Sequence, residues 1–420
     1  MKYTYPFNSN YKKSDVKINR MGISAGIALI PIFLGHCLFM KSTNIRNRMD
    51  KNFFGIALSF VPGIGCVLYK RLIDCFKNAE VVFDASFQEL TNIDGIGHET
   101  ALAIKNFDQG DLVENWLSMA KKVNARILTL EDEDYPTNLM RINNPPPVLY
   151  MKGEIKKDDH FAAAVVGSRT PSGYGELAAR SISRDLAAEG ITIVSGMARG
   201  IDAISHKEAL SAGGRTIAVL GSGIDVIYPP ENRELFNKIC RNGAVITEFP
   251  VSTPPDAVNF PNRNRIISGL SLGVVIVEAG VKSGSLITAK FAVSQGKKVF
   301  AVPGQIGSVG SKGTNKLIKE GARLVESADD VVSAIFHFRS RQVLPQYRDY
   351  KEDRGEAGKE ENLSEDAKQV MTALTEGPLH IDTVAAKSKL NINEVSSILL
   401  NLELSGLITQ LPGKMFTRNS

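Results

Sequence analysis

The sequence has few of the residues that carry metal or nucleophilic chemistry. Only four cysteines occur in 420 residues, and none of them is spaced as CxxC. Neither a zinc site nor a disulfide framework is therefore indicated, and a reducing, cytoplasmic setting is expected. Six histidines leave few candidate general bases. The net charge is only +5, which neither requires nor excludes a polyanionic partner. These scarcities favour binding over catalysis, without a metal or other cofactor.

Long uncharged runs are also scarce, with one exception near the start. Residues 21–40 carry no charge, have about the length that spans a bilayer, and are flanked by basic residues on both sides. His36 and Pro31 argue against a membrane span, and Met49 begins a clear helical pattern as if translation started there. A membrane anchor, a disordered leader and a mis-extended start all remain open for residues 1–48. The membrane is not the expected partner.

An internal repeat follows Met49. VPGIGCVLYKRLIDCF (61–76) and IDGIGHETALAIKNF (93–107) each place Gly-Ile-Gly before an amphipathic helix. This pattern is typical of a helix-hairpin-helix pair, and it predicts a helical, SAM-like domain over 49–120. Such turns can present backbone N–H groups to a nucleic-acid phosphate. Because Asp94 and His98 leave the loops with little positive charge, a purely structural packing module is an equal alternative.

The middle of the chain alternates apolar runs with helical patterns. The clearest predicted strands are 162–167, 191–196, 216–221, 244–249, 274–280 and 298–304. Most of them end in glycine or a turn and lead into a helix, which predicts a doubly wound, Rossmann-like parallel sheet over 121–338. The fold class is therefore α/β.

The C-terminal part has a different character. Residues 339–362 are polar and almost free of apolar residues, so they predict a flexible linker. Residues 363–420 show three short helical patterns and a terminal hairpin, which predict a winged helix with 391–406 in the place of the recognition helix. Its five basic and six acidic side chains give a net charge of −1, which favours a protein contact or packing over reading a DNA groove.

Four turns follow the predicted strands, at the edge where a doubly wound sheet binds its ligands. They are GSRT (167–170), SGMARGID (195–202), GSG (221–223) and EAGVKSGS (278–285). Small residues let backbone N–H groups approach an anion, and basic residues add fixed charge. Together they predict a surface for several phosphates. The dinucleotide fingerprint GxGxxG is not met at 167–175, a Walker A lysine motif is missing, and no serine has an obvious histidine partner.

A further segment, NFPNRNRIIS (259–268), approaches a helix with arginines, asparagines and an aromatic. Arginine can clamp a phosphate and Phe260 can stack on a base, as in sites for single-stranded nucleic acid. The candidates for contact are Asn262, Arg263 and Arg265. The alternative is that Phe260 belongs to the core and that the arginines pair with acids such as Glu248 and Glu278. Asp202 is expected to cap its helix or to orient Arg199.

In this order and spacing, six motifs resemble the DprA/Smf (DNA processing protein A) family. They are VVGSRTPSGYG, SGMARGIDAISH, AVLGSGIDVIYPPEN, FPNRNRIISGLS, EAGVKSGSLITAKFA and VFAVPGQIGSVGSKGTNKLIKEGA. The resemblance implies an extended Rossmann-like domain that binds single-stranded DNA and protects it from nucleases. It also implies a homodimer that helps to load the RecA recombinase during natural transformation. The helical and winged helix regions are similar to accessory domains of the family, so the likeness covers nearly everything after Met49.

By position, the resemblance assigns phosphate binding to residues of three turns. They are Gly167, Ser168, Arg169, Gly196, Arg199, Gly200, Lys282, Ser283, Gly284 and Ser285. Some members carry a basic residue in the segment after Tyr-Pro. Here Tyr228 is followed by two prolines, which puts that contribution in doubt and leaves Arg233 as a substitute.

The rival hypothesis is an enzyme. Rossmann-like relatives of the family hydrolyse nucleoside monophosphates with a PGGxGTxxE motif, so a phosphoribohydrolase is the alternative function. This chain has VEAGVKSGSL at the strand–helix junction and PGQIGSVGSKG one strand later. The catalytic glutamate of that motif is not in place.

Overall fold

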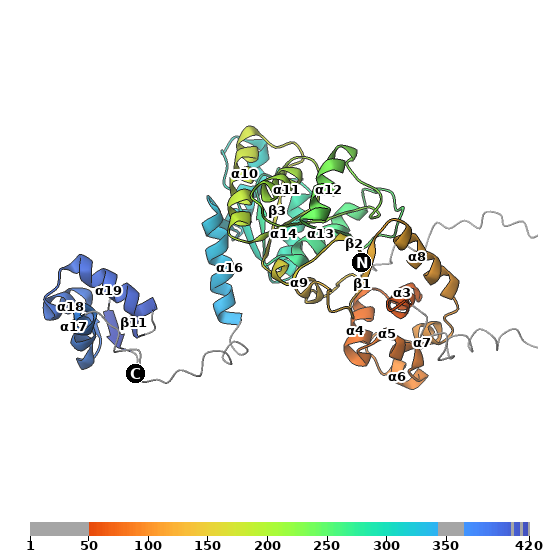
Figure 1. Ribbon diagram of the computed structural model, residues 1–420, viewed down its shortest axis with the longest axis horizontal. Helices are drawn as coiled ribbons and strands as arrows, with labels where there is room; N and C mark the ends of the chain where they lie inside the picture. The colour runs from red at the N-terminus through yellow and green to blue at the C-terminus, as the bar shows by residue number, and fades with distance from the viewer. Residues whose placement is uncertain (1–49, 343–364, 405–406, 412–414, 419–420) are drawn as a thin grey trace, which may run out of the picture. The chain divides into compact units, whose positions relative to one another are not determined.

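The structure is a computed structural model that describes residues 50–342, 365–404, 407–411 and 415–418. The chain divides into two compact units, residues 1–339 and 340–420 (Figure 1). The leader and its apolar stretch at 21–40 lie outside the described residues. Within the described residues, no helix has the length and apolar character needed to cross a bilayer.

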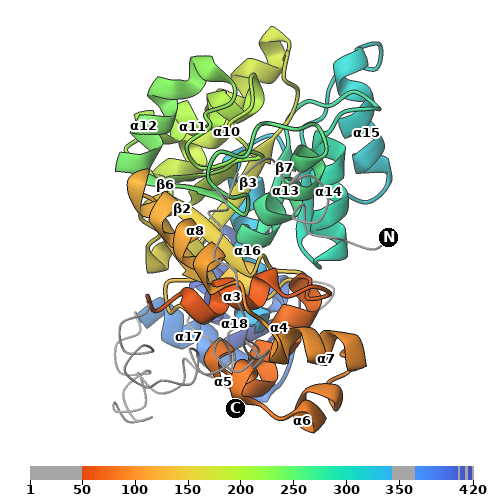
Figure 2. The ribbon, with the colours of Figure 1, turned by 90° about the vertical axis from the view of Figure 1, so that its right-hand side faces the viewer.

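The described part of the first unit begins with short helices. They are α3 (Phe53–Phe60), α4 (Cys66–Phe76), α5 (Ala79–Asp84), α6 (Phe87–Thr91), α7 (His98–Lys105) and α8 (Gly110–Lys122). Figures 1 and 2 show this helical region at one end of the sheet, where α3 and α8 pack against its first two strands. The helical region belongs to the same compact unit as the sheet, so the domain boundary expected near residue 120 stays a prediction.

The internal repeat forms the predicted pair of hairpins. Gly63 and Gly95 both have positive φ, 88° and 87°, which glycine adopts without strain. Each turn leads into a helix, α4 or α7, and each glycine faces the helix of the other hairpin. A Cβ on Gly63 would lie 3.0 Å from Thr100 Oγ1, and one on Gly95 would lie 2.9 Å from Leu68 Cδ2. The two hairpins therefore pack on each other in an approximately two-fold arrangement.

The sheet of the first unit has nine strands. They are β1 (Arg126–Thr129), β2 (Val148–Gly153), β3 (Ala162–Val166), β4 (Thr192–Ser195), β5 (Thr216–Val219), β6 (Gly243–Thr247), β7 (Gly273–Ile276), β8 (Lys298–Ala301) and β9 (Arg323–Leu324). Their order is β1-β2-β6-β5-β4-β3-β7-β8-β9, parallel from β6 to β9, with β1 and β2 antiparallel. All six predicted strands are confirmed. The strand order reverses between β3 and β7, which makes this pair the topological switch point.

Helices cover both faces of the sheet. They are α9 (Thr137–Met140), α10 (Gly173–Ala188), α11 (Ile201–Ser211), α12 (Arg233–Arg241), α13 (Asn259–Leu270), α14 (Ser285–Ser294), α15 (Lys312–Lys319) and α16 (Ala328–Gln342). In β3, Ala163 and Val165 join the core beneath α10 and α16, whereas Ala162 and Ala164 join the core beneath α13 and α14. This alternation, with both faces buried, is what a doubly wound sheet requires.

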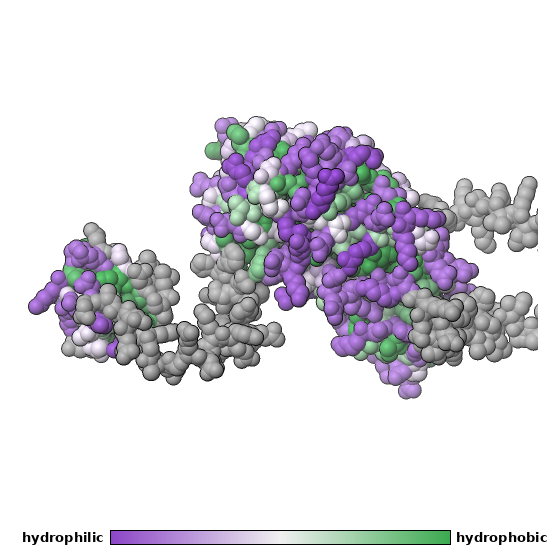
Figure 3. Space-filling model, in the orientation of Figure 1, coloured by the Kyte–Doolittle hydropathy of each residue, from purple (hydrophilic) through white to green (hydrophobic). Residues whose placement is uncertain are grey.

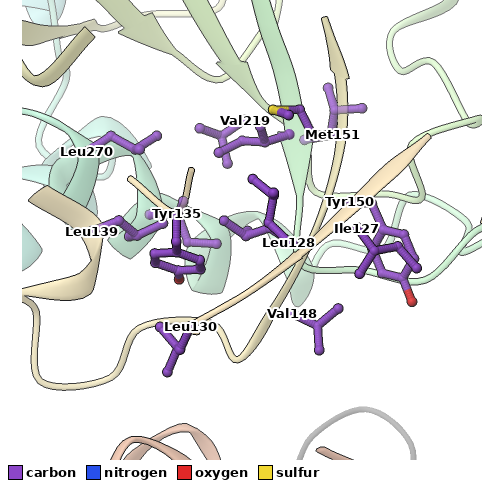
Figure 4. Close-up of a cluster of buried hydrophobic side chains, with 14 of the residues drawn as sticks. Ile127, Leu128, Leu130, Tyr135, Leu139, Val148, Tyr150, Met151, Val219 and Leu270 are labelled. Atoms are coloured by element: carbon purple, nitrogen blue, oxygen red, sulfur yellow. The ribbon is translucent and has the colours of Figure 1, made fainter. Parts of the chain in front are cut away.

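The core beside β1 and β2 is continuous with that of the sheet. Figure 4 shows buried side chains from β1, β2, α9 and α13 gathered together, among them Leu128, Leu139 and Leu270. The Asn138 amide donates to the carbonyls of His160 and Leu270, over 2.7 and 2.9 Å. These bonds fasten α9 to the end of α13, the helix that carries the predicted arginines.

The second unit is the predicted winged helix. It contains α17 (Glu365–Ala373), β10 (Leu379–His380), α18 (Ile381–Ser388), α19 (Ile392–Leu404), β11 (Ile408–Leu411) and β12 (Met415–Arg418). The three strands form a sheet in the order β10-β12-β11. Helix α19 occupies the segment expected for the recognition helix. Helix α16 runs to Gln342, so the first four residues of the predicted linker are helical. Residues 343–364 lie outside the described residues.

Candidate functional site

A cleft of about 1110 Å³ opens at the switch point, beyond the carboxyl ends of β3 and β7. Its walls are the turns that follow these two strands, and α13 and the segment around Tyr228 complete it. Of the thirteen residues predicted for the site, eight line the cleft: Gly167, Ser168, Arg169, Arg263, Lys282, Ser283, Gly284 and Ser285. The other five, Gly196, Arg199, Gly200, Asn262 and Arg265, do not.

The GSRT turn forms one wall, and its conformation is set by packing. A Cβ on Gly167 would lie 2.7 Å from the Ile201 side chain and 3.0 Å from the Glu278 carbonyl oxygen, so only glycine fits there. Ser168 Oγ accepts a hydrogen bond from the Thr170 amide, over 3.2 Å. Arg169 is exposed, and its guanidinium carbon lies 5.5 Å from the centre of the Phe260 ring. The turn thus offers a cation to the cleft.

The SGMARG turn lies directly behind this wall. Gly200 has a φ of 70°, and a Cβ there would overlap the carbonyl of Ser168. Asp202 accepts hydrogen bonds from the Gly196 and Ala198 amides, over 3.2 and 3.4 Å, so it fastens the turn to α11. Burial raises the pKa of Asp202, an effect that the nearby Arg263 guanidinium opposes.

Arg199 pairs with Glu231, whereas Asp202 was the carboxylate considered for orienting it. Its guanidinium forms an ion pair with Glu231, and both side chains are more than half exposed. This ion pair raises the pKa of Arg199 and lowers that of Glu231. Arg199 therefore stands beside the cleft with its charge matched by a carboxylate. Arg233, the expected substitute cation, is exposed at the start of α12 and does not line the cleft.

The KSGS turn forms the opposite wall. Lys282 is exposed, and the Ser283 and Ser285 hydroxyls share a hydrogen bond of 2.7 Å. Gly284 is the N-cap of α14, and a Cβ there would have no atom within 4 Å. The N-terminus of a ten-residue helix thus faces the cleft without obstruction. Its amide groups favour an anion at this point.

The two arginines of α13, Arg263 and Arg265, were predicted to contact a phosphate, but both side chains are buried. Arg263 is 3% exposed, and its guanidinium donates to the carbonyls of Gly196 and Val219. Gly196 is needed for this arrangement, because a Cβ there would overlap the guanidinium. Burial lowers the pKa of Arg263 to about 10, with the Asp202 carboxylate opposing the effect. Arg263 therefore joins the turn after β4 to the end of β5, and it lines the cleft as a buried side chain rather than as an exposed cation.

Arg265 is the second arginine of α13 that is buried instead of exposed. It forms a buried ion pair with Glu248, the two side chains being 5% and 8% exposed, and it donates to the Asn144 carbonyl over 2.9 Å. The alternative in which an arginine pairs with Glu248 is therefore confirmed for this residue.

The Glu278 carboxylate accepts hydrogen bonds from the backbone and hydroxyl of Ser172, the N-cap of α10. Asn262 is half-buried on α13, outside the cleft lining.

Among the cleft residues that were not predicted to be part of the site, two have side chains suited to binding a nucleic acid. Lys312 is exposed at the start of α15 and lines the cleft, although it follows a different strand from Lys282. Tyr228 also lines it, with its ring centre 5.7 Å from that of Phe260. Arg169, Lys282 and Lys312 are thus exposed cations on the cleft wall. A cleft with such charges, an open helix N-terminus and aromatic rings suits a polyanion that also carries flat apolar groups.

Comparison with known proteins identifies the family. The profile described as DNA recombination-mediator protein A matches residues 126–336, and that of the DprA winged helix domain matches residues 355–414. Protein Smf from Synechocystis sp. is 37% identical over 393 residues, which cover 87% of this chain and 98% of that protein. Protein Smf from Escherichia coli is 39% identical over 303 residues, which cover 72% and 79%.

A solved structure supports the same family. The X-ray structure of DNA processing protein A from Streptococcus pneumoniae matches with a TM-score of 0.59 and 32% identity, over 68% of this chain and 98% of that one. The chain is thus a member of the DprA/Smf family and carries both its core domain and its winged helix domain.

Proposed function

We propose that the protein binds single-stranded DNA through the phosphate backbone, in the cleft at the switch point. One observation carries the proposal: three exposed cations, Arg169, Lys282 and Lys312, reach one cleft from three separate strand ends. The open N-terminus of α14 at Gly284 adds backbone donors to the same surface. Phosphate contacts of this kind position a strand without reading its sequence.

The aromatic residues favour a single strand over a duplex. Tyr228 and Phe260 line the cleft beside Arg169. A base can stack on a side chain only when it is unpaired, whereas paired bases remain stacked inside a duplex. The cleft therefore suits a strand that carries both a phosphate backbone and free bases.

An electrophoretic titration tests this proposal. Single-stranded and double-stranded oligonucleotides of the same length and sequence are titrated with the full chain, at several salt concentrations. We expect tighter binding of the single strand, and a log affinity that falls by roughly 0.7 per contacted phosphate for each unit of log salt. Equal or tighter binding of the duplex would contradict the proposal, as would affinity that does not respond to salt.

We further propose that the bound strand is protected from nucleases and passed to the RecA recombinase in the cytoplasm, by a homodimer. The family resemblance supports these steps. In addition, β9 lies at the edge of the sheet and both of its residues are exposed, so one edge is open to pairing with a second copy. Light scattering measures the dimer, and RecA filament growth on the bound strand measures loading. A monomer at working concentration, or growth no faster than on free DNA, would overturn the respective step.

Hydrolysis of nucleoside monophosphates is the alternative. Incubation with AMP or UMP and chromatography of the products tests it directly. We expect no release of free base, because Glu278, the carboxylate at the end of β7, is buried against Ser172. Release at an appreciable rate would favour the enzyme.

A further inference from the structure

The elements from α13 to α15 carry charges of almost one sign. From residue 257 to residue 319 the chain has nine basic residues and a single acidic one, Glu278, which is buried. The segment 135–153, which contains α9, adds two basic residues and no acidic one. Much of the protein surface in Figure 3 is hydrophilic, with scattered apolar residues. Charge, rather than an apolar patch, therefore decides what these elements can bind.

A group of three basic residues lies at the C-terminal end of α14, outside the cleft lining. Lys70 of α4 donates hydrogen bonds to the carbonyls of Met140 and Ile142, over 3.0 and 3.1 Å. These two residues flank Arg141, which is exposed at the C-cap of α9. Lys297 is half-buried and comes two residues after the C-cap of α14. We call Lys70, Arg141 and Lys297 the distal cluster.

Packing brings the ends of α9 and α14 together, with α13 between them. A Cβ on Gly269, in the last turn of α13, would lie 2.8 Å from Leu139 Cδ1 of α9. On the other side, the Gln295 amide at the C-cap of α14 donates to the Arg265 carbonyl over 2.9 Å. The same amide group accepts a hydrogen bond from the Ser268 hydroxyl over 2.7 Å. The distal cluster is therefore built on helices that are fixed against each other.

The charges of the distal cluster are not matched by acids. Burial lowers the pKa of Lys297, and the nearby Arg141 guanidinium lowers it further. Within the part of the chain that the structure describes, no carboxylate forms an ion pair with any of the three cations. A structural role accounts for Lys70, which satisfies two carbonyls, and for a lysine at the C-terminus of a helix. It does not explain why a second cation lies near Lys297, an arrangement that a bound anion would stabilise.

One side of α14 connects the cleft to the distal cluster. Ile287 lines the cleft, and the exposed Lys290 lies three residues further along, on the same side of the helix. The helix has ten residues, so its two ends lie about 15 Å apart. A stacked strand advances about 3.4 Å per phosphate, so a strand that leaves the cleft along α14 reaches the distal cluster after roughly four or five nucleotides.

We propose that single-stranded DNA leaves the cleft along α14 and that Arg141 and Lys297 bind its phosphates at a second contact point, with Lys290 between the two. The inference rests on the proposed binding of single-stranded DNA in the cleft. Lys70 fixes the backbone on either side of Arg141 and adds to the charge of the cluster. Phosphate contacts carry no sequence information, so this extension accepts any sequence.

The experiment titrates the full chain with two single strands, one of about five nucleotides that the cleft alone can hold and one of about ten that reaches the distal cluster. Arg141→Gln combined with Lys297→Gln, the distal variant, should weaken binding of the long strand roughly five- to tenfold, because two exposed charge contacts are lost. The slope of log affinity against log salt should shrink by about 1.4 for the long strand. Binding of the short strand should be unchanged.

A matched control separates a direct contact from the general field of the protein. Arg184→Gln combined with Lys207→Gln removes the same charge from exposed positions of α10 and α11 outside the cleft lining, and should leave the binding of both strands unchanged. Equal weakening of the two strands by the distal variant would overturn the inference. So would a lower melting temperature with normal binding of the long strand, which would assign the two cations to packing. If the unmodified protein binds neither strand, the proposed function itself fails, and that outcome is distinct.

A second measurement needs no variant. A photoreactive base is placed at successive positions of the long strand, and the crosslinked peptides are identified by mass spectrometry. Bases held in the cleft should crosslink to the peptides that carry Arg169 or Lys282. Bases roughly four or five nucleotides away should crosslink to the peptides that carry Arg141 or Lys297. Crosslinks confined to the cleft peptides at every position would overturn the inference.

Discussion

The helical region and the sheet edge share a local structure, a glycine turn before a helix, but differ in the charge around it. In both, a glycine turn leads directly into a helix, as at Gly97 before α7 and Gly284 before α14. In the helical region, the cation beside one of the turns, Arg71, has its charge matched by an ion pair with Asp94. At the sheet edge, exposed cations surround the turn and a cleft lies in front of it. A glycine turn therefore offers backbone donors, but the charge and the hollow beside it decide whether an anion binds.

The largest effect, a loss of folding stability, is expected at Gly196, a glycine of the sheet edge that packs against a buried side chain. Gly196→Ala places a methyl group on the Arg263 guanidinium and separates it from two buried carbonyl acceptors. We expect the free energy of unfolding to fall by about 3 kcal/mol, because a buried charge loses its partners. Denaturant titration followed by circular dichroism measures this change. A variant as stable as the unmodified protein would mean that Arg263 does not hold these turns.

The next largest effect concerns the exposed cations. Arg169→Ala and Lys282→Ala should each weaken single-strand binding roughly tenfold, because a charge-assisted contact is lost. The slope of log affinity against log salt should shrink by about 0.7 for each variant, equally for all sequences. Arg184→Ala removes an exposed arginine of α10 outside the cleft and is the control. A markedly lower melting temperature with an unchanged slope would assign Arg169 a structural role instead.

A matched pair of glycines tests the comparison directly. Gly97 and Gly284 are both N-cap residues, and an added Cβ would have no atom within 4 Å at either position. Alanine should therefore leave stability unchanged in both variants. Gly284→Ala should weaken binding several-fold, since the methyl group stands where a phosphate approaches the helix. Gly97→Ala should have no effect. Weaker binding by the Gly97 variant would show that the helical region also contacts DNA.

A smaller effect, an increase in single-strand affinity, is expected from a residue beside the cleft. Glu231 forms an ion pair with Arg199, and exposed ion pairs are weak enough to exchange partners, so we expect Glu231 to compete with DNA for this cation. Glu231→Gln should therefore strengthen single-strand binding by about twofold and make its salt dependence steeper. Combining it with Arg199→Ala should abolish the gain. If the gain survives in the double variant, Glu231 acts through the general field and not through Arg199.

The smallest effect is expected from the second unit. A chain that ends at residue 362 loses the winged helix, whose net charge is −1. Its single-strand affinity should stay within about twofold of the full chain, because the proposed phosphate contacts lie in the first unit. Parallel titrations of the two chains measure the difference. A large loss, with the first unit still folded by circular dichroism, would reveal DNA contacts that the net charge conceals.

Much of this site was predictable from local sequence. An apolar run that ends in glycine marks the end of a buried parallel strand, and such ends meet at one edge, so the turns at Arg169 and Lys282 were found. The roles of Arg263 and Arg265 were not, because a helix with many polar residues suggests exposure. Here α13 is buried by the sheet and by α14, and its arginines find acceptors inside.

Lys312 and Tyr228 were missed for another reason. Both lie inside segments that resemble the family, but no chemical role was predicted for either residue, and each reaches the cleft only through the order of the strands. Lys312 follows β8 and Tyr228 follows β5, which lie on opposite sides of the switch point. Only the assembled sheet brings them together. Residues whose role depends on such long-range placement give no signal in a local pattern.

The pairing of β3 with β7 also sets when the cleft can exist. Its register joins Ala163 to Gly273 and Val166 to Ile276, positions far apart along the chain. A contact of such long range closes a large loop and is slow to form. During synthesis, the wall that carries Arg169 emerges well before the walls that carry Lys282 and Lys312. The proposed phosphate site is therefore incomplete in the nascent chain, and we expect DNA binding only after the two halves of the sheet have joined.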